Sequence, residues 1–275
     1  MPPEPLRLLI LGAHPDDAEY HAGGLATIYR DLGHTVKMVS VTNGGAGHHW
    51  RHPDELVLTR RQEATAAGKV IGAEYITWDF PDGALLPTLD VRAAIIREIR
   101  TYAPDLVLTH RTSDYHPDHR AVGQAVQDAS YMVTVPLVVP EVPILERDPV
   151  VAYMVDLFTR PCPLRADVVL SVDDQLDSIV AMLACHESQV FEFLPYNHDR
   201  GLRVPTEMGP RLEWLRNWYL QLVAPRAERF RQQLVATLGE SRAQEVRVVE
   251  AYEISEYAAA LDESTRQRLF PSASV

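Results

Sequence analysis

Short apolar runs alternate with longer amphipathic stretches along the first half of the chain. The apolar runs cover residues 6–11, 36–41, 75–78 and 106–109. Such short, nearly continuous runs are typical of strands that are buried on both faces of a parallel sheet. Between and after them, apolar residues recur at helical spacing, which predicts a helix in each interval. The predicted helices cover about residues 16–32, 55–71, 90–102 and 118–129.

This alternation with short links predicts an α/β fold with a doubly wound, Rossmann-like parallel sheet and right-handed crossovers. In such a sheet, ligands bind outside the carboxyl ends of the strands, where the strand order reverses. We therefore expect the first and fourth strands to be neighbours at a ligand site. Leu11-Gly12-Ala13-His14 follows the first strand instead of a Gly-x-Gly-x-x-Gly motif, which disfavours a nicotinamide dehydrogenase.

The pattern changes from Val135 onward, where prolines separate the apolar runs. The pattern there predicts further strands, a helix, a helical region interrupted near Pro225 and an edge strand. These elements cover residues 151–155, 168–172, 173–187, 210–238 and 246–249 respectively. We expect one α/β domain over residues 1–275. Residues 1–133 would form its core, and residues 134–275 would form a C-terminal extension of strands and helices that shapes the pocket.

Composition narrows the class of partner. The net charge of −12 disfavours nucleic acids and anionic membranes, because no broad basic surface is available to bind phosphates. Cys162 and Cys185 form no Cys-x-x-Cys motif, and so few cysteines in 275 residues indicate a reducing compartment. Residues 1–5 lack the features of a signal peptide, and no apolar stretch approaches the ~20 residues of a transmembrane helix. We therefore expect a cytoplasmic protein.

Two His-Pro-Asp clusters follow the first and fourth predicted strands. They are His14-Pro15-Asp16-Asp17 and His116-Pro117-Asp118-His119. Taken singly, each is about equally well explained as a turn with a helix cap. If the two strands are neighbours, His14, Asp17 and His119 supply the N, O and N ligands of one catalytic zinc ion, or of another divalent metal. Such a site keeps a fourth position for water and lowers the pKa of that water to ~7.

The remaining residues of the two clusters suggest catalytic roles. Asp16 is expected to point away from Asp17 on the tight turn and to act as the general base. Asp118 is expected to hold the His116 imidazole in one orientation and to favour its charged form. A cationic His116 would stabilise an oxyanion or protonate a leaving amine.

Ala13-His14-Pro15-Asp16-Asp17-Ala18-Glu19, followed by Gly23-Gly24, and His116-Pro117-Asp118-His119 resemble the two motifs of the LmbE/PIG-L deacetylases. The resemblance covers about the first 130 residues. It implies a zinc-dependent N-deacetylase that acts on N-acetylglucosamine-type amides. It also implies that His14, Asp17 and His119 are ligands, Asp16 the base, His116 its electrostatic or acid partner and Asp118 the residue that orients His116. Ala18 stands where many members have a glutamate, which leaves the branch of the family open.

Several residues outside the motifs are candidates for binding substrate. The resemblance implies a substrate-binding arginine near Arg60 and Arg61, and we favour Arg60, although a surface charge paired with Glu63 explains it as well. The other candidates are Asp82, Asn43, His48 and His186. Each also has a purely structural explanation: a turn for Asp82, a glycine-rich loop for Asn43 and His48, and the end of a predicted helix for His186.

We therefore expect a metal-dependent amide hydrolase that removes an N-acetyl group from an amino sugar or an N-acetylglucosamine-type conjugate. Its partner would be a small-molecule amino-sugar substrate, and a homo-oligomer is compatible with the proline-rich middle. Two alternatives stay open. One is an amidase that cleaves a larger amide, as thiol-conjugate amidases do. The other is a metal- or sugar-binding module without turnover, which would have no use for Asp16 as a spare carboxylate.

Overall fold

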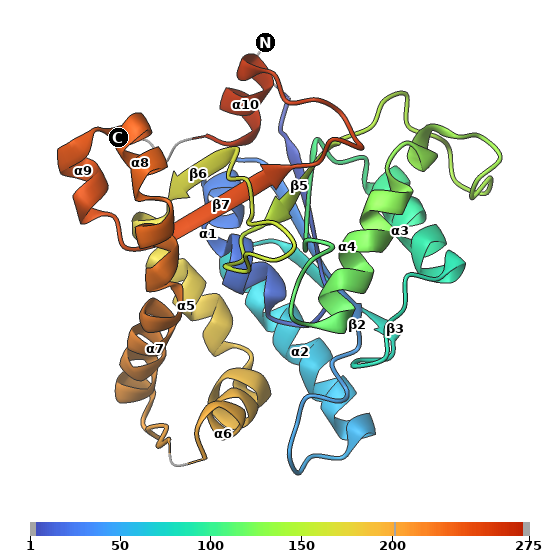
Figure 1. The fold of residues 1–275 in the computed structure, drawn as a ribbon. Helices are drawn as coiled ribbons and strands as arrows, with labels where there is room; N and C mark the ends of the chain where they lie inside the picture. The colour runs from blue at the N-terminus through green and yellow to red at the C-terminus, as the bar shows by residue number, and fades with distance from the viewer. Residues whose placement is uncertain (1–3, 201, 272–275) are drawn as a thin grey trace.

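Seven strands form one mixed sheet in the order β3-β2-β1-β4-β5-β7-β6 (Figure 1) in the computed structural model, which describes residues 4–200 and 202–271. The strands are β1 (Arg7–Gly12), β2 (Thr35–Thr42), β3 (Glu74–Phe80), β4 (Leu106–Thr109), β5 (Val150–Met154), β6 (Val168–Ser171) and β7 (Val249–Ile254). The first five strands pair in parallel, and β7 pairs antiparallel with both β5 and β6. The doubly wound α/β fold expected from the sequence is confirmed.

Helices cover both faces of this sheet. The helices are α1 (Asp17–Asp31), α2 (Pro53–Ile71), α3 (Leu89–Tyr102), α4 (Pro117–Ala129), α5 (Leu176–Ala184), α6 (Leu194–His198), α7 (Met208–Arg229), α8 (Arg231–Leu238), α9 (Glu240–Glu245) and α10 (Glu263–Leu269). Short 3₁₀ turns span Met132–Thr134 and Asp173–Gln175, and a π-helix spans Glu187–Phe193. Among the described helices, none is both long and apolar enough to cross a lipid bilayer.

The apolar run of β1 explains why helices are needed on both sides. Leu8 and Ile10 pack in a core with α1, α2, α5 and α7, whereas Leu9 and Leu11 pack in a second core with α3 and α4. All four side chains are fully buried. Burial of each contributes about 1.5–3 kcal/mol, so the strand is fixed at the centre of the sheet.

The first and fourth strands are neighbours, as the sequence predicts. In the parallel register of β1 and β4, Ile10 pairs with Leu108 and Leu11 pairs with Thr109. Both strands therefore end at the same edge of the sheet. The residues that follow them, which carry the two His-Pro-Asp clusters, emerge side by side.

Two expectations about the C-terminal half are wrong. The predicted edge strand at 246–249 is displaced toward the C-terminus, to Val249–Ile254, and it lies inside the sheet between β5 and β6. The predicted interruption near Pro225 is displaced to Phe230, because α7 continues through Pro225 to Arg229 and α8 begins at Arg231. Pro225 is exposed, so water can serve the backbone carbonyl that loses its hydrogen-bond partner there. The expectation of no signal peptide rests on residues 1–5. Of these, residues 1–3 lie outside the described part of the chain.

Candidate metal centre and active site

Three side chains from the two clusters converge at the carboxyl ends of β1 and β4. The Nδ1 atom of His14 lies 3.4 Å from an Asp17 carboxylate oxygen and 3.3 Å from Nε2 of His119. Nε2 of His119 lies 3.4 Å from the other Asp17 oxygen. Zinc–ligand bonds of about 2.0–2.2 Å in a tetrahedron require ligand atoms about 3.3–3.5 Å apart. His14, Asp17 and His119 could therefore hold a divalent metal through two imidazole nitrogens and the Asp17 carboxylate.

The position of Asp17 depends on a residue without a side chain. A Cβ atom on Gly12 would lie 2.8 Å from the Asp17 Cβ, closer than packed carbons approach. Because Gly12 leaves this space open, the Asp17 carboxylate folds back over the end of β1 and accepts a hydrogen bond of 2.7 Å from the His14 backbone N–H. This contact fixes the spacing between the first two candidate ligands.

Further carboxylates hold the outer nitrogen atoms of both histidines. Nε2 of His14 lies 3.2 Å from an oxygen of Asp118 and 3.2 Å from an oxygen of Asp82. Nδ1 of His119 lies 3.1 Å from Asp114. Such partners fix the orientation of an imidazole and raise its basicity as a ligand. Although burial opposes it, these carboxylates and Asp17 raise the pKa of His14 well above its ordinary value and that of His119 to about 9.

The expected pairing of Asp118 with His116 is wrong. The Asp118 carboxylate accepts hydrogen bonds from the backbone N–H groups of Gly83 and Leu85, and it contacts His14 rather than His116. It is the backbone N–H of Asp118 that donates to Nδ1 of His116, so His116 caps α4. Asp118 therefore orients a candidate metal ligand and ties the 83–85 loop to it.

The surroundings of His116 favour its neutral form. Because Nδ1 accepts from the Asp118 N–H, the proton of the neutral ring lies on Nε2. Burial, together with the charges of His14 and His119, lowers the pKa of His116. The direction of this shift disfavours the cationic His116 that the sequence suggests. Its ring centroid lies 4.5 Å from that of His14, which places this donor beside the candidate metal position.

Asp16 occupies a strained position next to the candidate ligands. Its backbone φ of 115° lies in the left-handed region, which costs a non-glycine residue about 1–3 kcal/mol. Its N–H donates to the Tyr75 hydroxyl, and its side chain makes no helix-capping hydrogen bond, although the sequence suggests one. Burial and the neighbouring Asp17 charge raise the pKa of Asp16 to about 7. A carboxylate with this pKa suits proton transfer near neutral pH.

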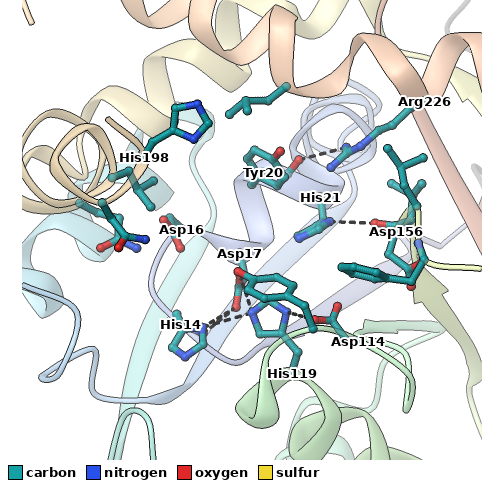
Figure 2. Close-up of a pocket in the computed structure, with 18 of the residues that line it drawn as sticks. His14, Asp16, Asp17, Tyr20, His21, Asp114, His119, Asp156, His198 and Arg226 are labelled. Carbon is teal, nitrogen blue, oxygen red and sulfur yellow. Dashed lines mark hydrogen bonds and ion pairs between the residues drawn. The ribbon is translucent and has the colours of Figure 1, made fainter. Parts of the chain in front are cut away.

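A cavity of about 510 Å³ opens over these residues (Figure 2). This volume lies within the range of small-molecule sites. His14, Asp16, Asp17 and His119 line one end, as Figure 2 shows. The rest of the wall is mixed. Its apolar and aromatic residues are Tyr20, Tyr115, Val155, Leu157, Phe158, Leu194, Trp218 and Leu222, and its polar residues are His21, Asp114, Asp156, Gln189, Asn197, His198 and Arg226.

The four residues expected to bind substrate do not line this cavity, and each has a protein partner. Arg60, 1% exposed, donates to the carbonyl of Gly47, and its charge lowers the pKa of Asp16. Asp82 accepts from the backbone of the glycine-rich loop and contacts His14. Asn43 accepts from the Gly45 N–H, and His48 contacts Glu192. These residues support the walls of the site, so direct binding of substrate by them remains only a prediction.

The structure adds residues that sequence reasoning did not single out, among them His110 and Gln189, and it shows where the expected candidate His186 lies. His110 stacks on His119 with ring centroids 3.9 Å apart and contacts Asp17 at 3.1 Å. His186 contacts Glu19 at 2.7 Å, and both side chains are fully buried beneath the site rather than in the cavity. The π-helix Glu187–Phe193 brings Gln189 to the cavity wall. His110 directly follows β4, so its place at a strand end was a usable signal, whereas a π-helix leaves no clear sequence pattern.

Comparison with known proteins agrees with this geometry. Residues 9–130 match the PIG-L family, described as GlcNAc-PI de-N-acetylase, and this segment contains both His-Pro-Asp clusters. The 4-oxalmesaconate hydratase of Pseudomonas putida is 25% identical over 212 residues, which cover 73% of this chain and 82% of that protein. The probable N-acetyl-alpha-D-glucosaminyl L-malate deacetylase 2 of Bacillus cereus is 26% identical over 223 residues, which cover 76% of this chain and 93% of that protein.

A solved structure extends the likeness to the C-terminal half. The N,N'-diacetylchitobiose deacetylase from Pyrococcus horikoshii superposes with a TM-score of 0.69 and 18% sequence identity. The match covers 90% of this chain and 83% of that chain. At this level of identity the comparison establishes a shared fold over most of the chain.

Proposed function

We propose that this chain, which carries a PIG-L (LmbE) family domain over residues 9–130, is a zinc-dependent hydrolase that removes an N-acetyl group from an amino sugar or an N-acetylglucosamine-type conjugate. The observation that carries the proposal is the convergence of His14, Asp17 and His119, with three contacts of 3.3–3.4 Å that involve both Asp17 oxygens, beside the Asp16 carboxylate of raised pKa. A relative named as a deacetylase of an N-acetylglucosaminyl conjugate supports the choice of substrate.

Zinc held by His14, Asp17 and His119 would polarise the acetyl carbonyl and lower the pKa of water to about 7. In this proposal Asp16 takes a proton from the attacking water. The neutral His116 donates a hydrogen bond from Nε2 to the oxyanion that develops at the carbonyl oxygen. Because His116 is not held as a cation, Asp16 is also the group that returns the proton to the leaving amine. The products are acetate and a free amine.

The carboxylates around the ligands keep this arrangement rigid. Asp118 and Asp82 fix the ring of His14, and Asp114 fixes that of His119. Arg60 and His186 act on Asp16 from behind, where their charges limit the rise in its pKa. Asp16 is thereby kept ionised in a large part of the molecules at pH 7 and still able to hold a proton.

Replacement of the base tests the proposal. Asp16→Asn should keep one zinc per chain but lose about 10²–10⁴-fold in kcat for acetate release, the usual contribution of a general acid–base residue. Asp54→Asn, whose side chain is 95% exposed, is the matched control and should behave as the wild type. Acetate release by Asp16→Asn at a rate near that of the wild type would show that the assignment of the base is wrong.

A second candidate function is addition of water to a carbon–carbon double bond that is conjugated to a carboxylate. It is favoured by the similarity to the 4-oxalmesaconate hydratase, which covers 73% of this chain. The same residues would serve, with Asp16 passing the proton of water to carbon instead of nitrogen. Loss of ultraviolet absorbance by a conjugated unsaturated acid, without acetate release from any N-acetylated sugar, would favour this function.

A further inference from the structure

An arginine is buried in the cavity wall without a carboxylate partner. Arg226 lies in the last turn of α7 and is only 4% exposed. It makes no ion pair with any carboxylate in the described part of the chain, and the one hydrogen bond of its guanidinium there is a long one of 3.4 Å from Nη1 to the Tyr20 carbonyl. A buried charge without a partner is costly, so its place at a ligand cavity calls for a partner that comes from outside.

The carboxylates nearest to this end of the cavity are already engaged. Asp156 lines the cavity, but it forms an ion pair with Arg111 at 3.0 Å. Both oxygens of the buried Glu250 accept hydrogen bonds, at 2.6 Å from the Gly24 N–H and at 2.9 Å from the Leu25 N–H. The Arg226 charge lowers the pKa of Glu250 against the effect of burial, so the two groups interact, but they do not form an ion pair.

The surroundings of Arg226 hold its guanidinium plane in place. Its Cζ lies 5.0 Å from the centre of the Tyr20 ring, a cation–π contact. Among the described residues that line the cavity, Arg226 is the single arginine or lysine. Figure 2 shows it at the end of the cavity away from His14, with Tyr20 and His21 between. A helix C-terminus favours a cation in general, but Arg229 in the same turn meets that preference outside the cavity.

We propose that Arg226 binds an anionic oxygen group, a carboxylate or a phosphate, on the substrate at a point remote from the bond that is cleaved. The inference rests on the proposed function in that the same molecule carries the acetamide at the metal end. The guanidinium fork matches two oxygens of either group. The apolar wall between the two ends would contact the uncharged body of the substrate. The substrate class is thus an acidic N-acetylated amino-sugar conjugate rather than a neutral sugar.

Calorimetric binding tests this without turnover, in zinc-loaded Asp16→Asn protein. The probes are the carboxymethyl glycoside of N-acetylglucosamine, its uncharged carbamoylmethyl isostere and N-acetylglucosamine 1-phosphate. At least one anionic probe should bind about 10- to 100-fold more tightly than the isostere, in line with hydrogen bonds between charged groups. The probe that does so identifies the carboxylate or the phosphate as the group recognised.

Added to this background, Arg226→Gln should abolish the preference, Arg226→Lys should keep part of it, and Arg229→Gln, which removes a charge from the same helical turn, should keep all of it. Equal affinity for charged and uncharged probes with Arg226 present, or an unchanged preference in Arg226→Gln, would overturn the inference. The inference would also be overturned if the Arg226 variants lost only thermal stability and kept the preference for charged probes. Arg226 would then serve only to balance the charge of Glu250. Acetate release by the wild type is measured separately, so an anion preference without hydrolysis would refute the proposed function and leave this inference standing.

Discussion

Nδ1 of His14 and Nε2 of His119 lie 3.3 Å apart, although 105 positions separate the two residues in the chain. When each neutral ring carries its proton on the outer nitrogen, which faces a carboxylate, neither of these two inner nitrogens has a proton to donate. A shared cation would stabilise such a contact. The adjacent register of β1 and β4 produces it, because the two loops leave the sheet at the same edge.

Zinc binding should release protons and strengthen as the pH rises. In the metal-free protein, and against the effect of burial, carboxylates raise the pKa of His119 to about 9 and that of His14 well above its ordinary 6.5. The stability that these raised pKa values give the metal-free fold is fully present below pH 6.5 and is lost as the pH rises through about 9. Zinc must displace these protons, so its affinity should increase between pH 6 and 9.

Calorimetry at pH 7 in two buffers of different ionisation enthalpy measures this release. We expect more than one proton for each zinc ion bound, and fewer protons in His119→Ala. An affinity that does not change with pH over this range, or binding without proton release, would mean that the two imidazoles are not ligands.

Gly12→Ala should weaken the metal site without unfolding the protein. The added Cβ would lie 2.8 Å from the Asp17 Cβ and push that carboxylate away from His14. We expect zinc affinity to fall by at least tenfold, as it does for changes that disturb ligand orientation. Gly209→Ala is the matched control, because a Cβ there meets no atom within 4 Å and zinc affinity should not change. Competition with a fluorescent chelator measures both, and equal affinities would contradict the role given to Gly12.

The buried pair of Glu19 and His186 should behave as a unit in stability measurements. The two side chains are fully buried and 2.7 Å apart. Burial by itself would lower the pKa of His186, but the neighbouring carboxylates, Glu19 first among them, raise it. His186→Leu leaves the Glu19 carboxylate without its partner and should cost about 3–5 kcal/mol in the free energy of unfolding. The double variant Glu19→Met/His186→Leu should recover most of that loss. Urea unfolding of the three proteins checks this, and additive losses would exclude coupling between the pair.

The convergence of the two His-Pro-Asp clusters could be predicted from the sequence, because its signals are local. Continuous apolar runs identify β1 and β4, and each cluster directly follows its strand. The topology of a doubly wound sheet then brings His14 and His119 together. The outer contacts escaped this reasoning. Whether the Asp118 side chain turns toward His116 or toward His14 depends on the 83–85 loop, whose path no local pattern reveals.

The C-terminal half was harder to predict, because its strand partners are not set by neighbouring residues. In β7 the polar Glu250 and Glu253 interrupt the apolar pattern. The pattern therefore predicts a strand that ends before Glu250, whereas β7 continues to Ile254. Glu250 is buried there because it caps the backbone N–H groups of Gly24 and Leu25, a contact across more than 200 positions. Arg226 was missed for the same reason, since only the packing of α7 brings it to the cavity.

Acetate release during zinc titration is the decisive test of the proposed zinc-dependent hydrolase. The wild-type protein is stripped of metal, zinc is returned in steps, and acetate release from an N-acetylated amino sugar conjugate is followed at each step. We expect no release without metal, a linear rise in rate, and a plateau at one zinc ion per chain that His14→Ala and His119→Ala do not reach. Release that is independent of zinc, or no release at any zinc level from neutral and acidic N-acetylated conjugates alike, would contradict it.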